Sequence, residues 1–190
     1  MLKDLFSNLI SLSKKFAKEH NVLDIVLYGS YARNKENPND IDIVLIFLNM
    51  PLDERLKLAQ VYKELLKNKF QNPDIKAINF TELFDSSFLA RQGILTEGIS
   101  LLDKTPLANK FGFEGYSLFN YNLLNLNNSK KTSFVYALSG RKKEGILDAV
   151  NAKHLGRGVV LVPISKSALF EDFLLHWNRK FKKDKILLSK

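Results

Sequence analysis

The sequence of 190 residues lacks cysteine entirely and contains one tryptophan, five prolines and nine glycines. Without cysteine it cannot form a disulfide, a thiolate zinc site or a cysteine nucleophile. The three histidines, His20, His154 and His176, are scattered and lack the spacing of metal ligands. The missing thiols fit a reducing compartment, so we expect a cytoplasmic protein.

Long apolar runs are also missing. The longest, Ile43 to Leu48, has six residues, whereas about 20 are needed to span a bilayer. Residues 1–20 place apolar side chains at helical spacing among lysines, which predicts an amphipathic helix and not a secretory signal. We therefore expect no membrane segment, and the apolar content of 45% is sufficient for a buried core.

Positive charge is in excess, and it is unevenly placed. The formal net charge is +9, yet residues 1–105 contain 14 basic and 14 acidic residues, whereas residues 106–190 contain 15 basic and 6 acidic residues. A basic segment next to a neutral one suggests that the second part meets an anionic partner. Nucleic acid is the partner we expect for residues 106–190, and an anionic membrane surface is less favoured.

The pattern of apolar residues predicts two domains, with a boundary where a proline follows the polar cluster 103–106. Residues 1–105 alternate helix and strand, which predicts an α/β (α+β) unit, and residues 106–190 form a smaller basic α+β domain. The expected strands of the first part are 22–28, 40–47, 74–80 and the short stretch 99–102, and its helices are 1–20, one from 31, 52–69 and 87–97. In the second part we expect extended chain over 111–121, strands at 159–164 and 186–188, and helices at 129–139, 145–150 and 167–177.

Gly29 and Ser30 interrupt the chain directly after the apolar run 22–28. Gly29 ends the expected strand and Ser30 opens a helix, so backbone N–H groups at the positive end of that helix offer a site for a phosphate. The alternative is that Gly29 only makes a turn and Ser30 only caps the helix.

Asp40 and Asp42 stand one residue apart at the start of the next strand. Side chains alternate along a strand, so both carboxylates face the same side, roughly 6.6 to 7 Å apart along the backbone. Like charges in this arrangement repel each other unless a cation lies between them, and Mg²⁺ prefers carboxylate and phosphate oxygens. By itself, however, an Asp-x-Asp pattern also occurs on solvated surfaces.

A third carboxylate, Asp74, begins the following strand. That strand, the one before it and the helix between them form a crossover; if the strands are parallel, both begin at the same end of the sheet. Three carboxylates there can hold two metal ions and activate a hydroxyl for in-line displacement at phosphorus. Alternatively, Asp74 is a turn residue or a partner of Lys76, and Glu82 or Asp85 supplies the third acid.

These residues resemble a known family. The pattern apolar-Gly-Ser, nine residues, Asp-apolar-Asp-apolar is similar to the signature of DNA polymerase β-like nucleotidyltransferases, in particular their minimal branch. It stands here as Leu27-Tyr28-Gly29-Ser30, then 31–39, then Asp40-Ile41-Asp42-Ile43, and the stretch 94–102 also matches that branch. The resemblance covers about residues 1–105 and implies a small mixed sheet flanked by helices.

The resemblance also implies an activity, namely transfer of a nucleoside monophosphate from a nucleoside triphosphate, ATP favoured, to an acceptor hydroxyl. Mg²⁺ or Mn²⁺ would be the cofactor and pyrophosphate the leaving group. Gly29 and Ser30 would hold the triphosphate, and Arg33 could reach a phosphate from the first helix turn. Asp40 and Asp42 would bind both metals, and Asp74 would complete the site and help to deprotonate the nucleophile.

The second part, residues 106–190, is not assigned to a family. Its aromatic residues between 111 and 121 alternate, which favours packing in a core over stacking on bases. Its basic residues cluster, partly in loops, where flexible side chains can follow a phosphate backbone. We predict nucleic-acid binding by Lys130, Lys131, Arg141, Lys142, Lys143, Lys153 and Arg157.

Two classes of function remain. The first is an enzyme whose neutral domain transfers a nucleotide to a nucleic acid, RNA favoured, presented by the basic domain; a protein hydroxyl is a variant acceptor, and a cationic aminoglycoside would be repelled. The second is a non-catalytic nucleic-acid-binding or antitoxin-like regulatory protein with the same fold. The enzyme is favoured, because a retired site has no physical reason to keep carboxylates that repel each other.

Overall fold

The computed structural model describes residues 2–32, 41–67, 69–70 and 72–190. The chain divides into two compact units, Met1–Phe111 and Gly112–Lys190, called the first and the second unit below. The division lies six residues beyond the boundary expected from the sequence at residues 105 and 106.

The first unit has a four-stranded mixed sheet in the order β3-β2-β1-β4. β1 pairs antiparallel with both β2 and β4, and β2 pairs parallel with β3. Its elements in chain order are α1 (Leu2–His20), β1 (Asp24–Tyr28), α2 (Gly29–Ala32), β2 (Ile41–Phe47), α3 (Leu52–Lys67), β3 (Pro73–Asn79), the 3₁₀ helix η1 (Phe80–Phe84), α4 (Arg91–Glu97), β4 (Ile99–Ser100) and α5 (Leu107–Lys110).

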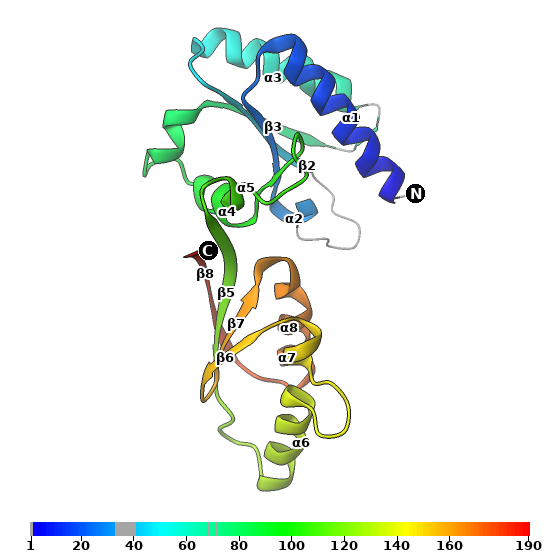
Figure 1. Ribbon diagram of the computed structural model, residues 1–190, viewed down its shortest axis with the longest axis vertical. Helices are drawn as coiled ribbons and strands as arrows, with labels where there is room; N and C mark the ends of the chain where they lie inside the picture. Colours follow the sequence, from blue (N-terminus) through cyan, green and yellow to red (C-terminus); the bar gives the residue numbers. More distant parts are fainter. Residues whose placement is uncertain (1, 33–40, 68, 71) are drawn as a thin grey trace. The chain divides into compact units, whose positions relative to one another are not determined.

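Both faces of this sheet are covered, because its strands are apolar on both sides. Figure 1 shows α1 and α3 next to each other, and their apolar side chains pack with Ile25, Leu27 and the matching residues of β2. Val26, Tyr28 and Val44 point to the opposite face, which η1, α4 and α5 cover. Within the described part of the chain, no helix is long and apolar enough to cross a membrane.

An ion-paired cluster around Asp24 holds α5 on the first unit, which explains why this unit extends to Phe111. Asp24 is only 4% exposed. Its carboxylate accepts hydrogen bonds from Lys110 Nζ at 2.6 Å, Ser100 Oγ at 2.8 Å and the backbone N–H of Ile25 at 2.8 Å. Lys110 also pairs with Asp103. Asp103, one of the polar residues that predicted a domain boundary, therefore belongs to this ion-paired cluster.

Lys110→Met is expected to lower the free energy of unfolding by about 2–3 kcal/mol, because the substitution leaves the buried Asp24 carboxylate without its cation. Denaturant unfolding at neutral pH measures the change. Lys57→Met, at an exposed position of α3, is the matched control and is expected to change stability by less than about 0.5 kcal/mol. Equal stability of the two variants would contradict the role given to Lys110.

The pKa of Lys110 determines how this stabilisation depends on pH. Partial burial works to lower that pKa, but the hydrogen bonds to Asp103 and Asp24 outweigh it and raise the pKa above its usual value. A cation whose pKa is raised by folding stabilises the fold fully below its unfolded pKa, about 10.4, and loses that stabilisation as pH rises through the folded pKa. The difference between wild type and Lys110→Met should therefore shrink as the pH rises into the strongly alkaline range.

The second unit has a four-stranded antiparallel sheet in the order β6-β7-β5-β8. With α7 as an addition, its succession of elements is β-α-β-β-α-β, the arrangement of ferredoxin-like folds. The elements are β5 (Phe113–Tyr121), α6 (Asn128–Ser139), α7 (Ile146–Ala149), β6 (Lys153–Gly156), β7 (Val159–Pro163), the 3₁₀ helix η2 (Ile164–Lys166), α8 (Ser167–His176) and β8 (Phe181–Ser189).

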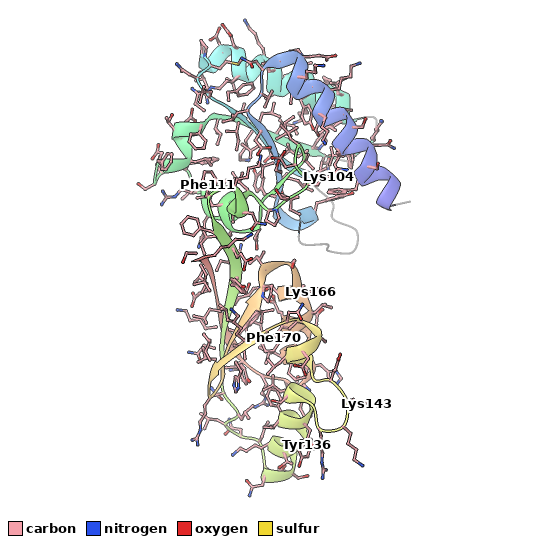
Figure 2. All side chains as sticks on the ribbon, in the orientation of Figure 1. Lys104, Phe111, Tyr136, Lys143, Lys166 and Phe170 are labelled. Atoms are coloured by element: carbon pink, nitrogen blue, oxygen red, sulfur yellow. The ribbon has the colours of Figure 1, made fainter. Side chains whose placement is uncertain are left out.

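One face of this second sheet packs against α6 and α8. Phe119, Phe134 and Phe170 are fully buried there, and Figure 2 labels Phe170. Tyr121 is also buried in this core, so the packing role predicted for the alternating aromatic residues is confirmed at positions 119 and 121. β8 is longer than the predicted strand 186–188, because it pairs with β5 over the whole length of that strand.

Candidate functional site

Three polar side chains form one row across the sheet of the first unit. Tyr28, the last residue of β1, is opposite Asp42 of β2, and Asp42 is opposite Asp74 of β3. Residues opposite each other on paired strands point to the same face, and neighbouring strands lie about 4.8 Å apart. The parallel pairing on which the predicted proximity of Asp42 and Asp74 depended is confirmed.

The row lies at one end of the sheet, on the face covered by α4 and α5. Asp42 has the same orientation as the buried Val44 and Ile46, two and four residues further along β2. Asp42 is half-buried, and the side chain of Asp74 is 52% exposed. The apolar face of the sheet therefore ends in two carboxylates that a ligand can reach at least from the Asp74 side.

Gly29 follows Tyr28 directly and packs against the carboxylate of Asp42. Its φ of +75° is a conformation that residues with a side chain rarely adopt. A Cβ at position 29 would lie 2.9 Å from Cγ of Asp42 and closer still to Oδ2. Glycine is therefore required here for two reasons. One is the backbone conformation, and the other is that the carboxylate of Asp42 lies where a Cβ would be.

Lys76, two residues beyond Asp74 on β3, introduces a cation into the row. Its Nζ donates a hydrogen bond to Oδ2 of Asp74 at 2.5 Å. Partial burial opposes the charged form of Lys76, but Asp74 and Tyr28 outweigh it and raise its pKa. Asp74 therefore shares its charge with an ammonium group, and a metal ion bound by Asp74 has to compete with that group.

Tyr28 is the uncharged member of the row. Burial raises the pKa of Tyr28; Lys76 acts in the opposite direction, and the charges of Asp42 and Asp74 add to the rise. The phenol is consequently neutral at physiological pH and can donate or accept a hydrogen bond, but it is no base. The sequence patterns did not single out Tyr28, whose position opposite Asp42 depends on strand pairing.

Not every predicted site residue can be placed. Asp40 and Arg33 lie outside the described residues, and Ser30 follows Gly29 in the short helix α2. The structure brings Gly29, Asp42 and Asp74 together, and these three residues come from three different elements.

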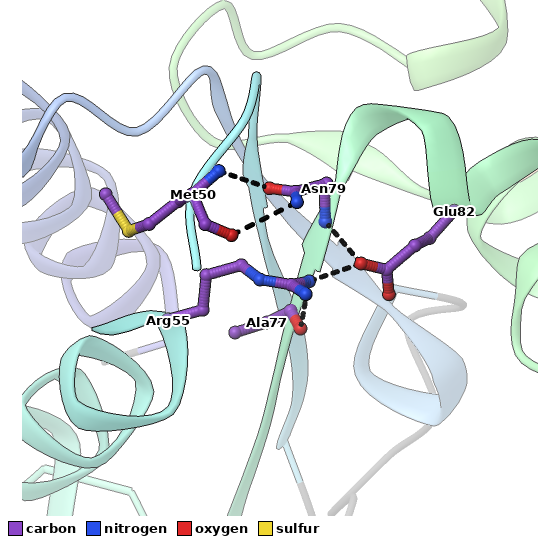
Figure 3. Close-up of polar contacts among 5 residues, drawn as sticks. All are labelled: Met50, Arg55, Ala77, Asn79 and Glu82. Atoms are coloured by element: carbon purple, nitrogen blue, oxygen red, sulfur yellow. Dashed lines mark hydrogen bonds and ion pairs between the residues drawn. The ribbon is translucent and has the colours of Figure 1, made fainter. Parts of the chain in front are cut away.

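Glu82 and Asp85, the alternatives considered for the third acid, lie beyond the other end of β3. Glu82 Oε1 accepts a hydrogen bond from Arg55 Nη1 at 2.5 Å and one from the backbone N–H of Asn79 at 3.1 Å, as Figure 3 shows. Asn79 is five residues after Asp74, roughly 16 Å along an extended strand. Glu82 therefore supports the fold by pairing with the buried Arg55, and it is remote from Asp42.

The residues in the row fit a hard divalent cation. Carboxylate oxygens are the donors that Mg²⁺ prefers, usually one or two from the protein together with substrate phosphates. Because Gly29 has no Cβ, the carboxylate of Asp42 occupies the place that a Cβ would take. Within the described residues, no group of three or more acidic, histidine or cysteine side chains forms a complete metal site. Asp42 and Asp74 thus supply part of a donor set.

The basic residues predicted to bind nucleic acid are spread over the second unit. Lys130 and Lys131 lie in the first turn of α6, Lys153 begins β6, and Arg141, Lys142 and Lys143 are exposed in the loop between α6 and α7. Of the seven, Lys131 and Arg157 line a common cavity, together with His154.

The comparisons with known proteins agree with this geometry. The family model described as polymerase beta, nucleotidyltransferase, matches residues 11–106, slightly more than half of the chain. The chain belongs to this family of nucleotidyltransferases, and the predicted resemblance is confirmed. The matched residues include Gly29, Asp42 and Asp74. No curated protein matches the sequence closely enough to count as a relative.

Solved structures similar to this chain include complexes of toxins and antitoxins. One is a toxin-antitoxin complex with AMP-PNP, with 24% sequence identity, 48% of this chain and 71% of that chain covered, and a TM-score of 0.37. Another contains a tri-AMPylated HEPN toxin of Shewanella oneidensis with an MNT antitoxin, with 21% identity, 58% and 79% covered, and a TM-score of 0.37.

Proposed function

We propose that this protein transfers a nucleoside monophosphate from a nucleoside triphosphate, ATP favoured, to a hydroxyl group of a nucleic acid, RNA favoured. The observation that carries this proposal is the in-register pair Asp42 and Asp74 beside Gly29, within a family of nucleotidyltransferases. The charge of residues 106–190 supports an anionic acceptor.

The proposed reaction is an in-line displacement at the α-phosphorus. The acceptor oxygen forms a bond to that phosphorus, the bond from phosphorus to the bridging oxygen of the β-phosphate breaks, and pyrophosphate leaves. Asp42 and Asp74, with Asp40, would hold Mg²⁺ or Mn²⁺, which when bound neutralises the charge of the triphosphate. Asp74 lies at the exposed side of the row, where its carboxylate can take the proton of the attacking hydroxyl.

The residues around the carboxylates have matching roles in this proposal. The turn at Gly29 and Ser30 would receive the triphosphate, because a glycine backbone allows close approach of phosphate oxygens, and the carboxylate of Asp42 lies directly against Gly29. Arg33 would reach a phosphate. Lys76 would hold Asp74 in place in the free protein and would turn towards the nucleotide's negative charge when metal occupies the carboxylate.

The function is tested by incubating the full chain with each nucleoside triphosphate, labelled at the α- or the γ-phosphate, with Mg²⁺ or Mn²⁺ and with RNA, DNA or protein acceptors. We expect the α-label to enter RNA and the γ-label to stay out of it, since pyrophosphate leaves. If label enters protein alone, the acceptor is a protein hydroxyl and not a nucleic acid. If no acceptor takes up label from any triphosphate and no metal-dependent nucleotide binding is seen, the protein is the non-catalytic alternative.

A further inference from the structure

A cavity of about 540 Å³ lies in the second unit, between α6, the chain that follows β5 and the turn between β6 and β7. Cavities of about 300–1,000 Å³ are the usual size of small-ligand sites. The proposed nucleotidyl transfer uses the first unit, so it gives this cavity no role.

The walls of the cavity are largely aromatic and aliphatic, and they are held firmly. Tyr121 and Phe134 are buried, with ring centroids 5.6 Å apart, and Phe134 also packs edge-on against Trp177. The backbone N–H of Tyr121 donates to the carbonyl of Gly158 at 2.8 Å. A Cβ on Gly158 would collide with the backbone of Tyr121, so glycine fixes the turn against β5.

Cations lie at the rim of these apolar walls. These cations are Lys131 of α6 and Arg157 of the turn; both are exposed, as is the neighbouring His154 of β6, and none of the residues that line the cavity is acidic. The whole second unit contains 14 lysines and arginines against 6 acidic residues, a net charge of +8. A fitting ligand therefore combines an apolar, preferably flat group with negative charge next to it.

We propose that this cavity binds an unpaired base of a single-stranded nucleic acid, while Lys131 and Arg157 contact the phosphates on either side of that base. The charge of the unit favours a polyanion over a ligand with one carboxylate. A double helix keeps its bases stacked and paired, whereas a single strand can turn a base out against exposed apolar side chains such as Leu124 and Val135. The choice of a nucleic acid as the ligand rests on the proposed function. The inference adds to that function that the acceptor strand is unpaired.

Three probes test the proposal on the unchanged full chain. Fluorescence anisotropy compares a labelled single-stranded RNA with its duplex and with a single strand of equal length that lacks bases, without nucleotide or Mg²⁺. Because burying one base against apolar side chains is worth about a tenfold change in affinity, we expect the single strand to bind about tenfold more tightly than either competitor. Equal affinity for the three probes, or no binding of any, would overturn the proposal.

Two substitutions then locate the binding. Val135 lines the cavity from α6 and is 44% exposed, so Val135→Asp places a negative charge in the cavity without disturbing the core. We expect Val135→Asp and Arg157→Gln each to weaken single-strand binding about tenfold. The controls lie outside the lining: Leu175→Asp, at a 56% exposed position of α8, and Lys166→Gln, at an exposed position of η2 that Figure 2 labels.

The controls should change the affinity by less than about twofold. If Lys166→Gln weakens binding as much as Arg157→Gln, diffuse charge and not the cavity holds the strand, and the proposal is wrong. If the cavity variants leave binding unchanged while label transfer to RNA persists, this inference fails and the proposed function stands. If the cavity binds the strand but no label is ever transferred, the proposed function fails and the cavity assignment stands.

Discussion

Asp42→Asn is expected to lower transfer of the α-label by about 1,000-fold, the largest loss for any single substitution considered. Asparagine keeps the shape of the side chain but removes the charge from the residue at the centre of the row, between Tyr28 and Asp74. Electrostatic stabilisation by a bound metal is worth several kcal/mol in such reactions, and about 4 kcal/mol corresponds to about 1,000-fold. Single-turnover transfer with saturating triphosphate measures the loss.

The matched control for this prediction is Asp53→Asn, at an exposed position in the first turn of α3. It removes one carboxylate from the same unit, and transfer should stay within about twofold of wild type. Unfolding curves of both variants should resemble that of wild type, which separates loss of chemistry from loss of fold. Transfer by Asp42→Asn at more than about a tenth of the wild-type rate would remove Asp42 from the proposed metal site.

Much of the first unit could be predicted, because its strands bury both faces and so are nearly continuous apolar runs. Asp42 stood out in such a run, and the rule for crossovers brought Asp74 to the same end of the sheet. The structure agrees in detail, since these two residues are direct neighbours on β2 and β3. Alternation along strands was thus sufficient to identify which side chains share a face.

Ion pairs between distant elements were beyond sequence patterns. Arg55 stands in α3 like any charged residue of an amphipathic helix, yet it is 6% exposed because Glu82, 27 residues further on, neutralises it. Asp24 and Lys110 are 86 residues apart and form a similar pair. Because of this pair, the first unit ends later in the chain than the sequence predicted. The local pattern of residues around a buried charge does not show which distant residue pairs with it.

The second unit was predicted less well, because its elements depend on long-range pairing. β6 has four exposed residues and no apolar alternation, so its pairing with β7 alone makes it a strand. His154 comes to the rim of the cavity only through that pairing. The clusters of basic residues were visible in the sequence, whereas the apolar walls beside Arg157 were not.

Gly29→Ala is the second substitution with a large expected effect, a loss of transfer of about 100-fold. The new methyl group meets the carboxylate of Asp42, so the side chain, the backbone or both must shift. A displacement of about 1 Å at a catalytic group is enough for a loss of about 100-fold. Asp42 itself is kept, so the loss should be smaller than for Asp42→Asn. The same transfer assay measures it, together with the free energy of unfolding.

Substitutions at two other glycines distinguish the two possible causes of this loss of transfer, backbone strain and the contact with Asp42. Gly112 has the same φ of +75° but open space around its Cβ position, and Gly93, in α4, has open space and an ordinary φ. Gly112→Ala should cost about 1–2 kcal/mol of stability through the backbone alone, and Gly93→Ala should be neutral or stabilising by up to about 1 kcal/mol. Neither should reduce transfer more than about twofold. If Gly112→Ala reduced transfer as strongly as Gly29→Ala, general destabilisation would explain both losses, and the contact between Gly29 and Asp42 would have no special part in the chemistry.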